Sequence, residues 1–336
     1  MKNKTPLFIL IATIIFSLFL VLGNQKAYAQ TPLELQVSPP IIEVTIDPGD
    51  TYSDFIKFQN LSDIDTLELY PLMLSFVAKG EEGGQEFIED SEETTNFSLA
   101  QWINISTDKV FIEPLERIVL PFTITVPVDA EPGGRYGAVL LGNQPLVPEG
   151  GSNVALGART GTIILAKISG DVTESAILTE YRVGKDSYQY PPVDFSIRIE
   201  NVGNIHVKPE GEIEIKNIFG KSVDRVLVNE AGGNVLPESI RKFTPSWERD
   251  KFTIGKFTAA LSLEYGVDNP MELSETISFW VLPLKEIIIV VVALILVVIL
   301  FFVLVKTYNK LIVKKAIKKQ QKTGSQNTPP TGVPQA

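Results

Sequence analysis

A run of nineteen residues near the C-terminal end, 287–305, contains no charge, no glycine and no proline, and is almost entirely Ile, Val, Leu and Phe. As a helix rising about 1.5 Å per residue it would reach roughly 28 Å, close to the hydrocarbon thickness of a bilayer. A buried helix of a soluble protein is seldom apolar on all sides for this length. The run therefore predicts a transmembrane helix, assigned to residues 285–306.

The N-terminal residues contain the three parts of a secretory signal peptide. Lys2 and Lys4 precede an apolar run at 7–22, and Ala-Tyr-Ala at 27–29 provides the small-x-small pattern of a cleavage site. We expect residues 1–29 to be removed. An uncleaved signal anchor is the alternative; it would place the same following segment outside the cell and add a second span.

The residues after the apolar run set the orientation of the chain. This segment contains seven lysines and no acidic residue: Lys306, Lys310, Lys314, Lys315, Lys318, Lys319 and Lys322. Short lysine-rich segments stay in the cytoplasm. We therefore expect a single-pass type I membrane protein, with residues 30–286 extracellular and residues 307–336 forming a basic, largely disordered cytoplasmic tail.

Charge and composition exclude several classes of function. The part between the signal peptide and the tail holds 20 of the 30 basic residues and all 40 acidic ones, a net charge near −20. Such a surface does not attract nucleic acid. The chain has no cysteine and a single histidine, His206, which removes disulfides and most Ser-His-Asp, Cys-His and polyhistidine metal chemistry. We predict no catalytic, cofactor or metal site.

Short runs that alternate apolar and polar residues follow the signal peptide, separated by Pro, Gly and Asn turns. The first series spans residues 33–37, 41–46, 55–60, 67–76, 103–106, 110–112, 118–126, 136–141 and 160–168, with one helical turn at 98–102. The second series spans residues 177–183, 193–200, 205–215, 223–228, 240–247, 257–265 and 276–280. These patterns predict an all-β ectodomain of two tandem Ig-like antiparallel β-sandwiches, residues 30–172 and 173–284. The acidic segment 79–95 is interpreted as a mobile loop or a hairpin tip.

The two series share three landmarks in the same order. They are a strand that ends in Asn, a Pro that opens a polar strand, and a Gly just before an apolar strand: Asn60 and Asn201, Pro114 and Pro237, Gly134 and Gly255. We expect each Asn to tolerate left-handed backbone and to bond its own turn. The shared order predicts that one fold occurs twice.

These features resemble a known family. Ser-Pro-Pro at 38–40, Gln-Asn-Leu-Ser at 59–62, Ser-Leu-Ala-Gln-Trp at 98–102 and the glycine turn at 132–137 precede a second sandwich, one span and a lysine tail. The sequence is similar to the Gram-positive WxL-interacting cell-surface proteins (the DUF916 and DUF3324 families). That resemblance implies two Ig-like domains at the cell wall, the first binding peptidoglycan and the second binding protein partners. The compact second domain and the acidic ectodomain depart from the pattern. The first domain is also similar to pilus-chaperone and major-sperm-protein sandwiches.

Two groups of residues are candidate contacts. Trp102, Arg135 and Tyr136 are candidates for a ligand or a partner, since aromatic rings stack on sugars, although core packing explains them as well. In the tail, Lys310, Lys314, Lys315, Lys318 and Lys319 are candidates for anionic lipid, and a purely topological role explains them equally.

Three hypotheses follow. The first is a non-enzymatic, membrane-anchored surface protein that binds peptidoglycan or other surface proteins, including WxL-type partners. The alternative is a membrane-tethered chaperone or assembly factor that offers a strand edge to exported subunits. The weakest is a hydrolase that uses acid pairs.

Overall fold

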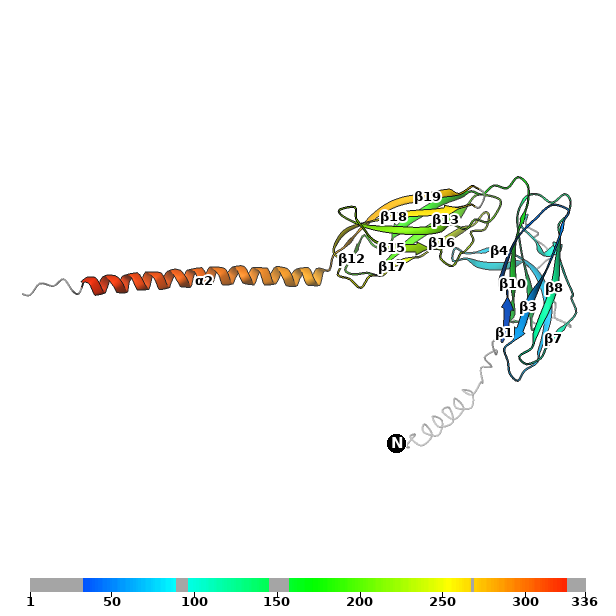
Figure 1. The fold of residues 1–336 in the computed structure, drawn as a ribbon, viewed down its shortest axis with the longest axis horizontal. Helices are drawn as coiled ribbons and strands as arrows, with labels where there is room; N and C mark the ends of the chain where they lie inside the picture. Colours follow the sequence, from blue (N-terminus) through cyan, green and yellow to red (C-terminus); the bar gives the residue numbers. More distant parts are fainter. Residues whose placement is uncertain (1–32, 89–95, 145–156, 267–268, 325–336) are drawn as a thin grey trace, which may run out of the picture. The chain divides into compact units, whose positions relative to one another are not determined.

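The computed structural model describes residues 33–88, 96–144, 157–266 and 269–324 of the 336-residue chain. The predicted signal peptide, residues 1–29, lies outside them. The chain divides into two compact units, one of Met1–Val77 with Gln85–Val172 and one of Ala78–Gly84 with Thr173–Ala336. Each unit contains paired β-sheets, and one long helix follows the second (Figure 1). The predicted class, an all-β ectodomain of Ig-like sandwiches with one C-terminal apolar helix, is confirmed.

The described residues of the first unit form two sheets. Their strands are β1 (Leu35–Ser38), β2 (Ile41–Ile46), β3 (Thr51–Asn60), β4 (Leu67–Lys79), β5 (Gly84–Ile88), β6 (Ile103–Ile105), β7 (Val110–Ile112), β8 (Arg117–Thr125), β9 (Gly133–Gly142) and β10 (Arg159–Ile168). One sheet has the order β1-β3-β8-β6, and the other has the order β2-β10-β9-β4-β5, with β7 beside β4. The helical turn predicted at 98–102 is a short 3-10 helix, η1 (Ala100–Trp102).

The second unit repeats this arrangement. Its strands are β11 (Ala176–Val183), β12 (Ser187–Tyr188), β13 (Val193–Asn201), β14 (Glu210–Asn217), β15 (Ser222–Val228), β16 (Ile240–Phe243), β17 (Ser246–Trp247), β18 (Gly255–Tyr265) and β19 (Met271–Val281). The sheet orders β11-β13-β16 and β12-β19-β18-β14-β15 correspond to β1-β3-β8 and β2-β10-β9-β4-β5 of the first unit. The short strands differ: β17 pairs with β13, whereas β6 pairs with β8. The same topology in both units confirms the predicted repeat.

The start of each unit is divided between its two sheets. β1 pairs with β3 in one sheet, and β2 then crosses to the other sheet, where it runs parallel to the last strand, β10. In the second unit β11 pairs with β13, and β12 runs parallel to β19. Two sandwiches with only antiparallel pairs were expected; these two edge pairs are the exception. They are parallel because β2 and β12, after the chain crosses to the second sheet of each unit, run in the same direction as the last strand of that unit.

The repeated asparagines tie strand ends to neighbouring turns. Asn60 and Asn201 are fully buried, and the side chain of Asn60 donates to three main-chain carbonyls at 2.7–3.1 Å. The side-chain oxygen of each Asn accepts from an amide two residues later, so the predicted bond to its own turn is confirmed.

The expectation of left-handed backbone at these asparagines was wrong. The left-handed residues of the repeat are Leu115 (φ 59°) and Glu238 (φ 58°), each directly after the predicted proline. Gly133 (φ 134°) and Gly255 (φ 120°) each begin an inner strand with a backbone that favours glycine, so Gly133, rather than Gly134, corresponds to Gly255.

Several element boundaries differ from the predictions. The strand predicted at 205–215 begins at Glu210, and the one predicted at 240–247 is divided into β16 and β17. The strands β5 and β12 were missed. Because β5 pairs with β4, residues 79–88 form a hairpin, as one of the two interpretations held; residues 89–95 lie outside the described part.

Each unit has its own hydrophobic core between its sheets. In the second unit four buried rings pack together: Phe195, Trp247, Phe257 and Phe279, with centroids 5.4–6.0 Å apart. The first unit buries Phe58, Phe122 and a set of aliphatic side chains from both sheets. In the absence of cysteine, this packing holds the sandwiches together.

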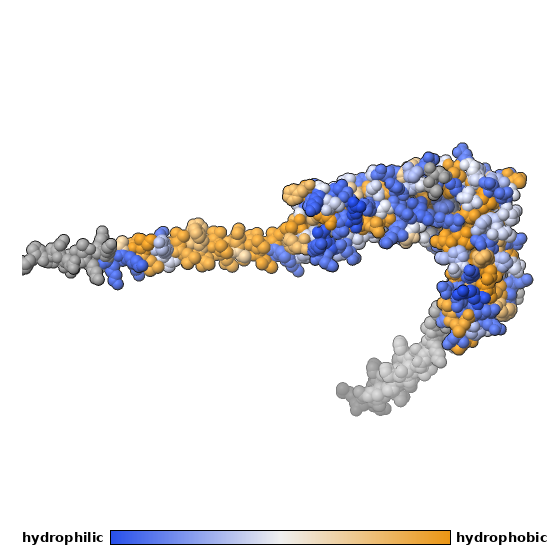
Figure 2. Space-filling model, in the orientation of Figure 1, coloured by the Kyte–Doolittle hydropathy of each residue, from blue (hydrophilic) through white to orange (hydrophobic). Residues whose placement is uncertain are grey.

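The helix α2 (Leu284–Gly324) follows β19 after two residues. Its segment Leu284–Lys318 is long and apolar enough to cross a membrane, and the most apolar part of that segment is not buried against the rest of the protein. Figure 2 shows this apolar stretch in orange, followed by hydrophilic residues. The tail was expected to be largely disordered from residue 307; the helix instead continues to Gly324.

Candidate functional site

The predicted ligand contacts in the first unit lie close together, but their side chains pack against other residues of the unit rather than pointing into solvent. Tyr136 is 1% exposed, and its ring lies 5.9 Å from that of Phe76 and 6.3 Å from that of Phe97. Its amide donates to the carbonyl of Phe97 at 2.7 Å. The prediction that Tyr136 contacts a ligand is corrected: every residue of β9 is buried, and this ring is covered by Phe76 and Phe97.

The side chains of Arg135 and Trp102 contact each other. The guanidinium of Arg135 lies 5.4 Å from the centre of the Trp102 ring and donates to the carbonyls of Gly134 (3.0 Å) and Glu131 (3.1 Å). Arg135 is 7% exposed, and burial lowers its pKa, against the raising effect of the nearby Glu131 charge. Since the described contacts of both side chains are internal, they give a ligand little to hold.

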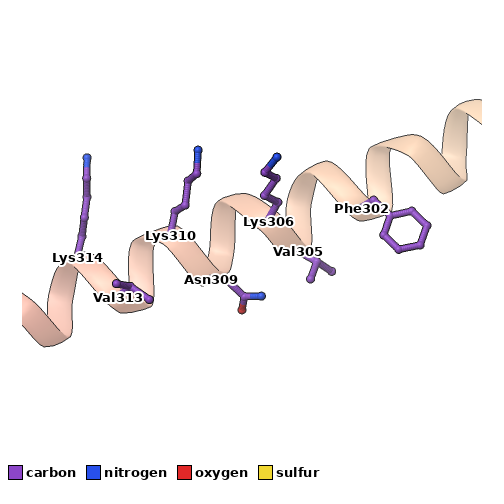
Figure 3. A pocket seen from close by; sticks show the side chains of 7 residues that line it. All are labelled: Phe302, Val305, Lys306, Asn309, Lys310, Val313 and Lys314. Carbon is purple, nitrogen blue, oxygen red and sulfur yellow. The ribbon is translucent and has the colours of Figure 1, made fainter.

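The candidate lipid contacts lie on α2. Figure 3 shows Lys306, Lys310 and Lys314 pointing to the same side of the helix, as the four-residue spacing predicts. Lys310, Lys314, Lys315 and Lys318 are exposed, whereas the side chain of Lys319 lies outside the described part. The hollow in Figure 3 is lined by residues of this one helix. Because it has no opposite wall, it does not enclose a ligand.

Among the described residues, no group of three or more His, Cys, Asp or Glu side chains is arranged to hold a metal ion. His206 lies in the segment before β14, beside the bridge that Val207 forms with Val235, rather than on a strand face as predicted.

The strand β19 of the second sandwich has a neighbour along only a small part of one side. On one side it pairs with β18 along its full length, Met271–Val281. On the other side its pairing partner in the described part of the chain is β12, which covers Trp280 and Val281 only. Within the described residues, the amides and carbonyls that face outward along residues 271–279 therefore pair with no other strand, although β11 of the facing sheet lies close to β19. An open row of such groups is a template for an additional strand.

The first unit covers the corresponding strand more fully. There β10 pairs with β9 over ten residues and with β2 over six, Ile163–Ile168. In the second unit the equivalent of β2 is the two-residue strand β12. The same topology thus leaves a longer free edge in the second sandwich, because β12 is shorter than β2.

The side chains beside this edge combine apolar surface with one charge. Met271, Leu273 and Ile277 face the core but are only partly buried. Glu275 occupies the same face, directly opposite the buried Leu261 of β18, and reaches solvent. An added strand would cover the half-buried apolar residues and bring a side chain of its own next to Glu275.

The charge of Glu275 also acts on the facing sheet. Burial, and then the charge of Glu275, raise the pKa of Tyr181 on β11 above its ordinary value of 10.0. Tyr181 is 6% exposed and its hydroxyl is 3.4 Å from the carbonyl of Ala259. The hydroxyl of Tyr181 therefore stays protonated at neutral pH.

Sequence reasoning placed a strand only at 276–280 and missed this site. The alternation Met271, Leu273, Ile277, Phe279 was present in the sequence, but Glu275 interrupts it at a core-facing position. An acidic residue in the apolar phase of a strand is itself a signal that the strand lies at the edge of a sheet, because inward-pointing charges are found on edge strands.

Comparisons with known proteins assign no family to this chain. No protein-family model matches the chain, and no curated protein is significantly similar in sequence. Similar solved structures include the class 5 fimbriae chaperone CfaA (9% identity, 74% of this chain and 100% of that chain, TM-score 0.35) and the Pseudomonas aeruginosa chaperone CupB2 (9%, 72% and 98%, 0.32). The E. coli chaperone DraB is also similar (12%, 72% and 98%, 0.33). At TM-scores below 0.5 these similarities do not assign a function to this chain.

Proposed function

We propose that this chain is a membrane-anchored, non-enzymatic protein that binds an extended segment of another exported protein along the open edge of β19. This is the function of an assembly factor or chaperone for surface subunits. The observation that carries it is the free edge at residues 271–279, next to half-buried apolar side chains.

Strand addition explains how such an edge binds. Main-chain hydrogen bonds to β19 give affinity that is independent of partner sequence, and alternate side chains of the partner meet the surface beside Met271, Leu273 and Ile277. Covering these side chains removes apolar area from water, at about 25 cal/mol per Å². A partner segment of nine residues would pair along the whole free edge, residues 271–279.

The charge at the edge selects the partner. In an antiparallel pair of two β19 strands centred on Glu275, the two carboxylates would lie opposite each other, and like charges in this position are destabilising. A segment that places Lys or Arg opposite Glu275 is favoured instead. This argues for a different protein rather than a second copy of this chain.

The anchor completes the proposal. We place residues 30–286 outside the cell and the lysine-rich end of α2 inside, because short lysine-rich segments remain in the cytoplasm. An anchored edge would keep the bound segment near the site of export. Binding to peptidoglycan, the function implied by the resemblance to WxL-interacting proteins, is the competing proposal; no exposed aromatic platform supports it at Trp102 and Tyr136.

A photocrosslinking experiment tests the edge in living cells. A photoreactive amino acid is placed at Ser274 or Thr276 on β19 of the full-length protein, and at the exposed Ser262 on the neighbouring strand β18 as the matched control. We expect Ser274 and Thr276 to crosslink to one partner protein, at partner residues two apart, because strands pair residue by residue. Ser262 should give no such product.

The outcomes are distinct. Glu275→Lys should abolish the crosslinks and Glu275→Gln should reduce them, since the first change opposes a basic partner residue. Crosslinks to glycan would support wall binding, and crosslinks between two copies of this chain would support a homodimer. Equal crosslinking from Ser262 would refute edge binding.

A further inference from the structure

Four segments far apart in the sequence meet at one end of the second sandwich. Asn217, at the end of β14, pairs with Phe257, and Gly255, at the start of β18, pairs with Val281 at the end of β19. The turn at 218–221, the segment 252–254 and the start of α2 therefore lie at the same end of one sheet. The parallel strand β12 also ends there, because Tyr188 pairs with Val281.

This end carries exposed apolar side chains. Phe219 is 90% exposed, Phe252 71%, Ile218 69% and Ile254 47%. At the opposite end of the same sandwich, where β13 and β18 end, the exposed large apolar side chains among the described residues are Leu227 (56%), Ile177 (49%) and Val202 (47%), and none of them is aromatic. Figure 2 shows hydrophobic residues gathered at the end of the sandwich that leads into α2.

The turn that carries Ile218 and Phe219 is held by its own hydrogen bonds. The side-chain oxygen of Asn217 accepts from the amides of Phe219 (3.0 Å) and Lys221 (3.1 Å). The amide of Asn217 donates to the carbonyl of Lys221 (2.9 Å). A fixed turn cannot fold its apolar side chains back onto the sandwich, so they stay presented to the surroundings.

Chain connectivity places these apolar side chains close to the start of α2. α2 begins at Leu284, three residues after Val281, and its uninterrupted apolar run begins at 287. If α2 spans the membrane, which is part of the proposed function, the loops at this end of the sheet lie within a few residues of the headgroups. Large isolated apolar patches on soluble surfaces are unusual, and those beside a membrane are buried in its interface.

We propose that the apolar end of the second sandwich, formed by Ile218, Phe219, Phe252 and Ile254, inserts into the outer-leaflet interface of the membrane that α2 crosses. Exposed charges of both signs surround it, with Lys221, Lys251 and Lys256 near Glu248 and Asp250. Apolar burial rather than charge attraction therefore drives the contact. The sandwich then stands on the membrane by two attachments, the helix and this apolar end.

Depth measurements on the full-length chain in phospholipid nanodiscs test the proposal. The protein has no cysteine, so single-cysteine variants take one nitroxide label each. Labels are placed at Phe219→Cys, at Val202→Cys as a matched control at the opposite end, and at Phe301→Cys inside α2. For the Phe219 label we expect a several-fold higher ratio of collisions with oxygen to collisions with a water-soluble nickel complex than for the Val202 label.

A second measurement removes the effect of the label itself. For a label at Ile254→Cys, the ratio of collisions with oxygen to collisions with the nickel complex should fall when Ile218→Ser and Phe219→Ser are added. Equal ratios at Phe219 and Val202, or an unchanged ratio at Ile254, would overturn the proposal while an immersed Phe301 label leaves the anchor standing. A water-exposed Phe301 label would overturn both the anchor and the proposal.

Discussion

The buried asparagine at the end of β13 should account for a large part of the stability of the second sandwich. Asn201 is fully buried and donates from Nδ2 to the carbonyls of Ile205 and Val235, both at 2.8 Å. Its Oδ1 accepts from the amide of Gly203 at 2.9 Å. Asn201→Ala removes all three bonds. The carbonyl of Val235 keeps the amide of Val207 and the amide of Gly203 keeps the carbonyl of Ser175, so the buried carbonyl of Ile205 is the group that loses its donor.

The magnitude follows from these bonds. Each hydrogen bond contributes about 1 kcal/mol net, and a buried group left unsatisfied costs about 1–3 kcal/mol. With one group left unsatisfied and two that keep a partner, we expect Asn201→Ala to lower the free energy of unfolding by about 2–4 kcal/mol. Asn201→Asp should cost at least as much, because an ionised carboxylate is only an acceptor and would face two carbonyl oxygens.

The assay is urea unfolding of the full-length protein in nanodiscs, followed by tryptophan fluorescence. The background change Trp102→Phe leaves Trp247 and Trp280, which both belong to the second unit. With a urea dependence of about 2 kcal/mol per M, the midpoint should fall by about 1–2 M.

A matched control decides whether the reasoning holds. Asn217 makes two side-chain bonds of similar length, but in an exposed turn where water can replace them, so Asn217→Ala should cost about 1 kcal/mol or less. If Asn201→Ala shifted the midpoint no more than Asn217→Ala, the buried network would not be what holds the end of β13.

Three further predictions concern the cores and one titrating group. Trp247→Phe should lower the stability of the second unit by about 2–3 kcal/mol in circular-dichroism melts, since it removes core volume and the bond from Nε1 to Asp224 at 3.0 Å. Gly161→Ala should lower that of the first unit by about 2 kcal/mol or more, because a Cβ there would lie 2.0 Å from the carbonyl oxygen of Val139; an unchanged melting temperature would contradict the close approach. Burial, and then the hydrogen bond from the Tyr52 hydroxyl, raise the pKa of Tyr52 to about 12. The contribution of Tyr52 to stability is therefore complete below pH 10 and is lost as the pH rises toward 12. Tyr52→Phe should flatten that part of the curve of unfolding free energy against pH.

Most of the fold could be predicted because the alternation of apolar and polar residues directly reports which side chains face a core. The strand at 41–46 was predicted with the bounds that β2 has, and the landmarks Asn60 and Asn201 revealed the repeat. The failures lie where that alternation is interrupted or too short. The two residues of β12 carry no period, and Glu275 conceals the first half of β19.

The candidate site was harder to predict than the fold. Sequence alone cannot separate an aromatic ring that packs from one that binds, so Tyr136 was proposed as a contact and proved to be core. An open strand edge depends on the length of a partner strand about ninety residues away, which no local pattern reports. The apolar end of the second sandwich joins residues that are adjacent only through the register of β14, β18 and β19.

The parallel pair at the edge of the first unit has a mechanical consequence. β2 and β10 are paired through six residues, from Ile41 with Ile163 to Ile46 with Ile168. A force that stretches the chain between its N-terminal side and the linker to the second unit pulls these two strands past each other from opposite ends. All six residue pairs would then bear the force at once, in shear, rather than separating one after another. Under such a force we expect other parts of the chain to unfold before β2 separates from β10.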